Sequence, residues 1–217
     1  MSESLLRAIL RLFAVVAHED EVSRPEREQI KSFLEDHMSG AAVEAYLRIF
    51  DEICASLPPR PKLWEEEVER LKQLCQEVSP NLTQKQKAVI LVELVTIIQA
   101  DGRISDRENQ LVRTIGEMFM VNNAAIEVIE KFVLGKVEPD LDDARILLIH
   151  ASDSELRNSP VIQKTALKGF IAVLYLDFVD LYFFRYMGTS SVFLNGVPVK
   201  SGKINVLAVG SLIRWEK

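Results

Sequence analysis

Apolar residues recur at helical spacing through the first 138 positions of the chain. The first run consists of Leu5, Leu6, Ile9, Leu12, Phe13 and Val16. A second helix is predicted to begin at Ser23 and to end at Gly40. A third helix occupies residues 41–57, and a proline-rich break at 58–61 separates it from a fourth. The three glutamates at 65–67 are expected to form a solvated first turn of this fourth helix.

The helical pattern repeats at a constant offset of 82 residues without a gap. Ser23 aligns with Ser105 and Glu26 aligns with Glu108, and the apolar positions on either side of these pairs also correspond. Three helices therefore recur, with the fourth lying between the two copies. We predict an all-α domain of about seven helices with an internal duplication, rather than a solenoid. Chance similarity between amphipathic helices is the alternative explanation.

After residue 138 the helical period gives way to short runs of β-branched and aromatic residues. The runs are ARILLIHA, GFIAVLYLD, VDLYFFRY, SVFLNG, KINVLAVG and SLIRW, and Gly, Asn or Asp separates them. Asn195-Gly196 is a strong signal for a two-residue hairpin. The predicted fold class is therefore α+β, with an all-α domain over residues 1–138 and a small all-β domain over residues 143–217.

Charge and composition exclude several classes of function. The net charge is −6, which argues against nucleic acid as the main partner. The charge is uneven, at −7 for residues 1–138 and +1 for residues 139–217. No apolar run is long enough to insert into a membrane, and the first residues do not resemble a signal peptide. Cys54 and Cys75 lack metal-ligand spacing, so we expect reduced core thiols in a cytoplasmic protein.

The acidic turn at residues 101–108 has an explanation in helix capping alone. Ser105 and Glu108 have the S-x-x-E spacing of a capping box, in which each side chain satisfies a backbone N–H group at the start of a helix. Gly102 supplies the positive φ that often follows a helix end. The same box pattern recurs at Ser23 with Glu26 and at Thr83 with Gln86.

Capping does not explain the further acids in these turns. Asp101 precedes Gly102, and Glu19 and Asp20 occupy the matching turn of the first copy. A duplicated domain tends to bring equivalent turns together near its pseudo-twofold axis, which would gather these acids beside Glu26 and Glu108. Grouped carboxylates repel one another unless a cation lies among them, and oxygen ligands suit Ca²⁺ or Mg²⁺. These five acids are the candidate metal ligands, although their spacing is not that of an EF-hand.

The pattern D-G-x-I-x-x-x-E from Asp101 to Glu108 resembles the TerB-like domain of tellurite-resistance proteins. The resemblance covers residues 1–138 and implies a helical domain whose acidic cluster takes a metal ion. By this resemblance Asp101 and Glu108 carry over as metal-site residues. The first copy departs from the motif, because Glu19 stands at the aspartate position and Asp20 at the glycine position.

The β segment resembles a degenerate forkhead-associated (FHA) domain, a small β-sandwich. The residues that carry this resemblance are SVFLNGVPVKSGKINVLAVGSLIRW. FHA domains bind phosphothreonine through an S-x-x-H motif and a Gly-Arg pair. This chain has no S-x-x-H motif, and its Gly-Arg pair, Gly102-Arg103, lies in the helical part. A phosphopeptide-binding module remains one alternative function.

The domain order resembles the N-terminal region of certain large bacterial ABC transporter ATP-binding proteins. This resemblance implies a non-catalytic regulatory or interaction region at the cytoplasmic face of the inner membrane. Its partners would be the ATPase and membrane parts of the same transporter, and the reading frame is expected to continue past Lys217. A free-standing TerB-like protein for metal sensing or for tellurite or stress resistance is the main alternative.

Two local features bear on these hypotheses. The segment GVPVKSGKI lacks the Walker A spacing, because five residues separate Gly196 from Gly202 and Ile204 follows the lysine. We therefore expect neither an ATP site nor enzymatic activity in this chain. The aromatic stretch at 181–186 is expected to be a strand buried on both faces, with a docking surface as the alternative.

Overall fold

The chain divides into two compact units, each with its own secondary structure. The computed structural model describes residues 3–17, 22–58, 61–151, 156–164 and 166–216. The first unit, Met1–Ile126, is called the helical unit, and the second, Glu127–Lys217, the β unit. Within the described residues, seven α-helices precede eight β-strands, which confirms the predicted α+β class.

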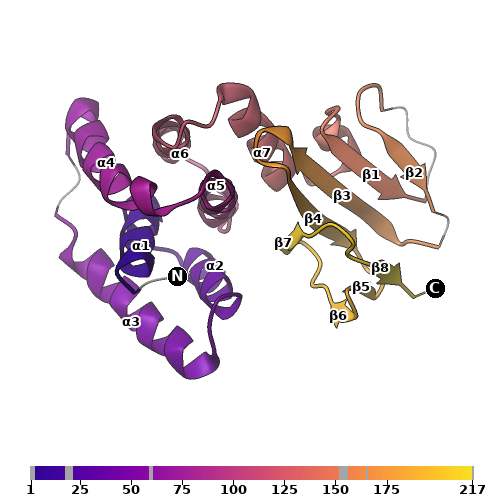
Figure 1. Cartoon of the computed structure of the whole chain (residues 1–217), viewed down its shortest axis with the longest axis horizontal. Helices are drawn as coiled ribbons and strands as arrows, with labels where there is room; N and C mark the ends of the chain where they lie inside the picture. The colour runs from indigo at the N-terminus through magenta and orange to yellow at the C-terminus, as the bar shows by residue number, and fades with distance from the viewer. Residues whose placement is uncertain (1–2, 18–21, 59–60, 152–155, 165, 217) are drawn as a thin grey trace. The chain divides into compact units, whose positions relative to one another are not determined.

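Helix boundaries follow the offset that the sequence predicted. The helices are α1 (Glu3–Ala17), α2 (Arg24–Glu35), α3 (Gly40–Ser56), α4 (Trp64–Val78), α5 (Gln84–Ile98), α6 (Asp106–Met118) and α7 (Asn123–Leu134) (Figure 1). The start of α2 at Arg24 lies 82 residues before the start of α6 at Asp106. The starts of α3 and α7 agree with the same offset to within one residue.

The prediction that Gly40 ends the second helix is wrong. The helix α2 ends at Glu35, and Gly40 is instead the first residue of α3. The backbone N–H groups of His37 and Met38 both donate to the carbonyl oxygen of Leu34, at 3.0 Å. This turn satisfies the end of α2 with ordinary negative φ values, so no glycine is required there.

Helices α1 and α5, which are equivalent in the two copies, form the centre of the helical unit. Both are apolar around most of their circumference, which is typical of a helix surrounded by other helices. The side chains of Leu10, Phe13, Leu91 and Leu94 are fully buried. Helix α1 contacts α3, α4, α5 and α6, and α5 contacts α2 and α6. The two copies of the duplication therefore share one core.

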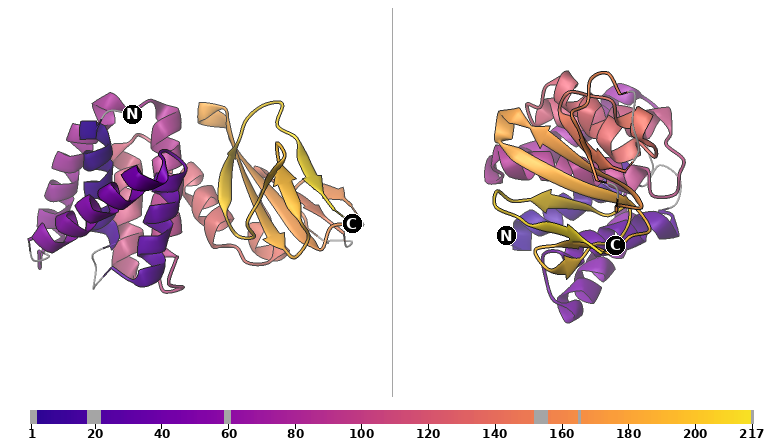
Figure 2. Two further views of the ribbon diagram at one scale, coloured as in Figure 1. Left: turned by 90° about the horizontal axis from the view of Figure 1, so that it is seen from below. Right: turned by 90° about the vertical axis from the view of Figure 1, so that its right-hand side faces the viewer.

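The β unit contains two sheets, whose strands pair in antiparallel fashion except for β1 with β2 (Figure 2). The strands are β1 (Ile146–His150), β2 (Val161–Gln163), β3 (Gly169–Leu176), β4 (Leu181–Gly188), β5 (Val192–Leu194), β6 (Val197–Pro198), β7 (Ile204–Leu207) and β8 (Ile213–Trp215). The larger sheet has the order β2-β1-β3-β4-β7, and the smaller one has the order β6-β5-β8. The sequence did not predict β2, a short and exposed edge strand that pairs with β1 in parallel.

The hairpin between β5 and β6 has the predicted two-residue turn. Leu194 pairs with Val197, so Asn195 and Gly196 alone make the connection. Their φ values of 52° and 84° are both positive, as a type I′ turn requires. The Asn195 carboxamide also accepts a hydrogen bond from the backbone N–H of Leu212, at 2.8 Å, which fixes the hairpin tip to the loop before β8.

Strand β4 is buried on both faces, as its aromatic sequence predicted. Phe184 and Tyr186 lie in the apolar core between the two sheets, where they pack with Ile171 and Val192. Phe183 is also buried, and alternation along the strand places it on the opposite face. Tyr182 is half-buried and stacks on Tyr175 with the ring centroids 4.5 Å apart.

A buried arginine on β4 joins the sheet to the end of α7. The Arg185 guanidinium donates hydrogen bonds to the carbonyl oxygens of Phe132 and Val133, at 2.6 and 2.8 Å. These carbonyls lie in the last turn of α7, where a helix leaves backbone acceptors unsatisfied and carries partial negative charge. The C-terminal half of α7 thereby belongs to the β unit. The compact units divide inside α7, whereas the sequence placed the junction at residues 139–142.

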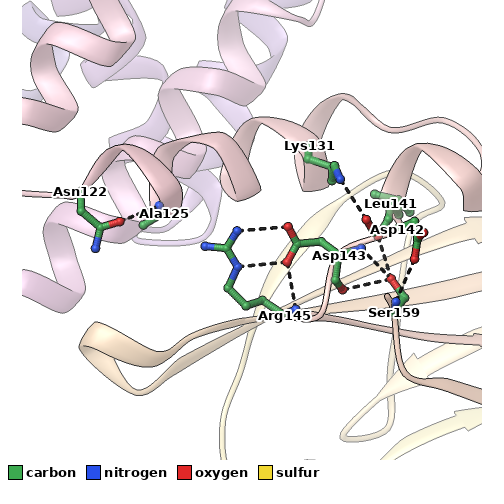
Figure 3. Close-up of polar contacts among 8 residues, drawn as sticks. All are labelled: Asn122, Ala125, Lys131, Leu141, Asp142, Asp143, Arg145 and Ser159. Carbon is green, nitrogen blue, oxygen red and sulfur yellow. Dashed lines mark hydrogen bonds and ion pairs between the residues drawn. The ribbon is translucent and has the colours of Figure 1, made fainter. Parts of the chain in front are cut away.

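An aspartate-rich segment after α7 organises the first strand of the β unit (Figure 3). The Asp142 carboxylate accepts hydrogen bonds from the backbone N–H groups of Asn158 and Ser159, each at 2.8 Å. The Ser159 hydroxyl donates to the carbonyl oxygen of Leu141, and Lys131 of α7 donates to that of Asp142, each at 3.0 Å. These bonds fasten the segment before β2 to the segment before β1.

Replacing Arg185 by methionine is expected to destabilise the β unit by about 2 kcal/mol. Methionine keeps much of the apolar contact of the arginine stem, but the two carbonyls of α7 lose a charged donor. Amide hydrogen exchange of β3 and β4 measures the change. Arg214→Met is the matched control, since Arg214 is exposed on β8. Equal protection in the two variants would contradict the structural role of Arg185.

Asp142→Asn is expected to weaken the β unit near neutral pH but not in acid. Hydrogen bonds from the backbone N–H groups of Ser159 and Asn158 hold the pKa of Asp142 below its ordinary value of 3.8. A depressed carboxyl pKa stabilises the folded state above the ordinary pKa, and this stabilisation is lost as the pH falls through the depressed value. Urea midpoints of the two proteins should therefore differ at pH 7 and converge once the pH falls below the depressed pKa of Asp142. Glu216→Gln, at an exposed position, is the control.

Candidate cation site

The first turns of α2 and α6 hold two glutamates in matching positions. The Glu26 carboxylate accepts a hydrogen bond from the backbone N–H of Ser23 at 2.7 Å, and the Glu108 carboxylate accepts one from Ser105 at 2.8 Å. Each serine hydroxyl accepts in return from the glutamate N–H, at 3.3 and 3.1 Å. Both predicted capping boxes are confirmed, as is a third at the start of α5.

Asp101 shapes the loop that leads into α6. Its Oδ1 accepts a hydrogen bond from the backbone N–H of Arg103, at 2.8 Å. Gly102, between them, has a φ of 79°, which a residue with a side chain rarely adopts. The loop therefore needs the aspartate and the glycine together, which explains why they are adjacent. Asp101 itself is exposed.

Carboxylates from both copies of the duplication act on one another electrostatically. Burial is the largest cause that raises the pKa of Glu26 above its ordinary value, and the hydrogen bonds from Ser23 oppose it. The negative charges of Glu108 and Asp101 raise this pKa further. Glu26 and Glu108 are only 5% and 7% exposed, so water screens their mutual repulsion poorly. Glu26 of the first copy therefore lies within electrostatic range of Asp101 and Glu108 of the second copy, while the convergence of these acids on one site stays a prediction.

The described acids do not by themselves form a metal-ligand set. In each of the two glutamates one oxygen, Oε2, is bonded to the capping backbone, and in Asp101 the oxygen so used is Oδ1. The remaining oxygens are hard donors of the kind that Ca²⁺ and Mg²⁺ prefer. No group of three His, Cys, Asp or Glu residues in the described parts of the chain is arranged to hold a metal ion. The other two candidates, Glu19 and Asp20, lie outside the described residues.

A buried ion pair beside the motif was not predicted. Arg107, which precedes Glu108, donates through Nε to the Glu67 carboxylate at 2.7 Å and through its terminal nitrogen to the carbonyl oxygen of Pro61 at 2.9 Å. Glu67 is 3% exposed, so its assignment to a solvated first turn is wrong, while Glu65 and Glu66 are exposed as expected. The burial arises because α4 packs on α6 and brings Glu67 against the arginine. The sequence signal for the burial of Glu67 was its seven-residue spacing from Leu74, which places both residues on the same face of α4.

The cysteines and the described histidines offer no reactive pair. Cys54 and Cys75 are both free, and burial raises the pKa of each thiol to about 11. Such thiols are poor nucleophiles near neutral pH. The His37 imidazole lies 2.8 Å from the carbonyl oxygen of Phe33, and His150 lies 3.5 Å from the Glu138 carboxylate. In the parts of the chain that the structure describes, no helix is long and apolar enough to cross a membrane.

Comparison with known proteins identifies the helical part of the chain. The family described as tellurite resistance protein TerB matches residues 6–131, which is more than half of the chain and includes Glu26, Asp101 and Glu108. No curated protein and no solved structure matches the chain. The family match agrees with the resemblance carried by the motif from Asp101 to Glu108, and we conclude that this protein belongs to the TerB family of tellurite resistance proteins.

Proposed function

We propose that the chain is a non-catalytic regulatory region whose helical unit binds a divalent cation, Ca²⁺ or Mg²⁺. The observation that carries the proposal is the raised pKa of the capping Glu26, which burial raises most and which the charges of Glu108 and Asp101 raise further. Three carboxylates within electrostatic reach destabilise the helical unit whenever all are ionised. A bound cation would remove this repulsion, so its binding would stabilise the fold.

The geometry indicates which atoms would take part. Glu26 and Glu108 are held by their capping bonds, so their carboxylates need little ordering when a cation binds. Asp101 is fixed by its own bond to the backbone of Arg103. Because Mg²⁺ keeps several of its waters and Ca²⁺ accepts six to eight oxygen ligands, carboxylates would share either ion with water. Glu19 and Asp20, which occupy the equivalent turn of the first copy in the sequence, are the further proposed ligands.

The double variant Asp101→Asn with Glu108→Gln should abolish any rise in melting temperature caused by Ca²⁺ or Mg²⁺. A site filled at about 100 times its dissociation constant adds about 2.7 kcal/mol to the free energy of unfolding. The wild-type chain should also show a Glu26 carboxyl pKa that falls when the cation is added, as measured by carbon-detected NMR titration. If millimolar cation changes neither the wild-type melt nor this pKa, the acids serve capping alone.

Two controls separate cation binding from capping and from net charge. Ser105→Ala removes a cap but keeps every carboxylate, so it should cost about 1 kcal/mol with or without the cation. Glu65→Gln with Glu66→Gln removes two exposed negative charges on α4 and should leave the cation response intact. A loss of response in this second control would indicate diffuse screening instead of a site.

In its natural setting, the chain is proposed to regulate an ABC transporter ATP-binding protein at the cytoplasmic face of the membrane. The order of a TerB domain followed by a small β unit supports this setting. Signal transfer would run from cation occupancy at the helical unit to the ATPase and membrane parts. The FHA-like character proposed for the β unit would make that unit the docking element.

An antiserum raised against this chain tests the transporter setting. It should detect, in the membrane fraction of the source cells, a polypeptide large enough to include an ATP-binding module and membrane spans of about 20 residues each. Detection of a polypeptide of only 217 residues would favour a free-standing metal-sensing or tellurite-resistance protein instead.

A further inference from the structure

The turn between β5 and β6 presents an asparagine that is followed directly by a glycine. Asn195-Gly196 is the only Asn-Gly pair in the sequence. Both residues are exposed, and a Cβ built on Gly196 would meet no described atom within 4 Å. Such a pair is chemically labile, because a glycine has no side chain to keep its backbone nitrogen away from the preceding carboxamide.

Hydrogen bonds hold the Asn195 carboxamide in the closed hairpin. Its Oδ1 accepts from the N–H of Leu212 at 2.8 Å, and its Nδ2 donates to the Ser211 hydroxyl at 3.2 Å. The Asn195 N–H also donates to the carbonyl oxygen of Leu212 at 2.8 Å. The carboxamide is therefore turned toward the loop before β8, and it becomes free to rotate toward the Gly196 nitrogen only when these contacts break.

Few contacts hold the small sheet that carries this turn. Strand β5 pairs with β6 at two positions and with β8 at three. Pro198 of β6 has no backbone N–H to donate to a ladder. The side chains of Val197 and Leu212 are 65% and 50% exposed, so they contribute little apolar burial. Short strands with little burial open locally at a lower free energy than the whole fold requires.

We propose that Asn195 is a deamidation site whose reaction is controlled by the opening of this hairpin. In the open state the Gly196 nitrogen loses its proton to a solvent base and attacks the Asn195 Cγ atom. The new N–Cγ bond closes a succinimide ring, the Cγ–Nδ2 bond breaks, and the nitrogen leaves as ammonia. Water then adds to either carbonyl carbon of the ring and yields aspartate or isoaspartate. No oxidant or reductant takes part.

The two products have different consequences for the fold. Aspartate keeps an oxygen that can accept from the N–H of Leu212, but it loses the donor to Ser211. Isoaspartate lengthens the main chain by the former Cβ atom, whereas the type I′ turn joins Leu194 to Val197 through two residues of ordinary length. The isoaspartate form therefore cannot rebuild the turn, and the small sheet of such a molecule stays loosened.

Peptide mapping of the full chain during incubation in mildly alkaline buffer tests the proposal. Trypsin releases residues 186–200, a peptide in which Asn195 is the sole asparagine and which contains no glutamine. Mass spectrometry and isoaspartyl-specific methylation should detect the two products in this peptide. Asn205 is the internal reference and should stay intact, because the β-branched Val206 follows it within β7. The chain unfolded in urea should react faster at Asn195 than the folded chain does.

Two serine variants isolate the control that the hairpin exerts. Ser211→Ala removes the acceptor of the Asn195 carboxamide and should raise the rate in the folded chain about threefold, as expected for the loss of one hydrogen bond. Ser191→Ala, at an exposed position before β5, keeps both carboxamide contacts and should react as the wild type does. In urea the wild type and both variants should react at one rate, because no hairpin remains.

Three results would contradict the proposal. Conversion of Asn195 no faster than that of Asn205 in the folded chain would exclude the site. A folded chain that reacts as fast as the unfolded one, or equal rates in the two serine variants, would exclude control by the hairpin. Amide hydrogen exchange in β5 and β8 that is as slow in the isoaspartate fraction as in the unmodified chain would exclude the loosening. None of these measurements involves a cation, so the result is independent of the proposed function.

Discussion

Every helix end in this chain leaves backbone groups that must be satisfied, and the structure depends on how side chains meet that requirement. Ser23 and Glu26 do so at the start of α2, and Ser105 and Glu108 do so at α6. At the C-terminal end of α7, the Arg185 guanidinium donates hydrogen bonds to the carbonyl oxygens of the last turn. An unpaired backbone group inside a protein costs free energy comparable to a lost hydrogen bond, so these contacts fix where each helix begins and ends.

The same requirement explains why acids are brought together in the helical unit. A capping glutamate must lie at the first turn, and the duplication brings two such turns close enough for their charges to interact. Capping alone would be satisfied by a neutral glutamine, as Gln86 shows at the start of α5. The choice of glutamate at both duplicated turns therefore adds repulsion that capping does not need. A cation site provides a reason for retaining two charged residues there, which is the basis of the proposed function.

The β unit distributes its chemistry in a different way. The polar contacts of Arg185 and Asp142 are structural, since they join α7 and its following segment to the sheet.

Local patterns were sufficient to predict much of this structure. Apolar periodicity located the seven helices, and the offset of 82 residues revealed the duplication. The residue types of the capping boxes and of Asn195-Gly196 predicted local turns, because such turns depend on a few neighbouring residues. Of the predicted acids, Glu26 lies within electrostatic range of Asp101 and Glu108, but their convergence on one site stays a prediction. The rest required the tertiary structure. The pairing of Glu67 with Arg107, the short strand β2 and the anchoring of α7 by Arg185 each depend on a contact between segments far apart in the chain, and a local pattern does not specify the distant partner.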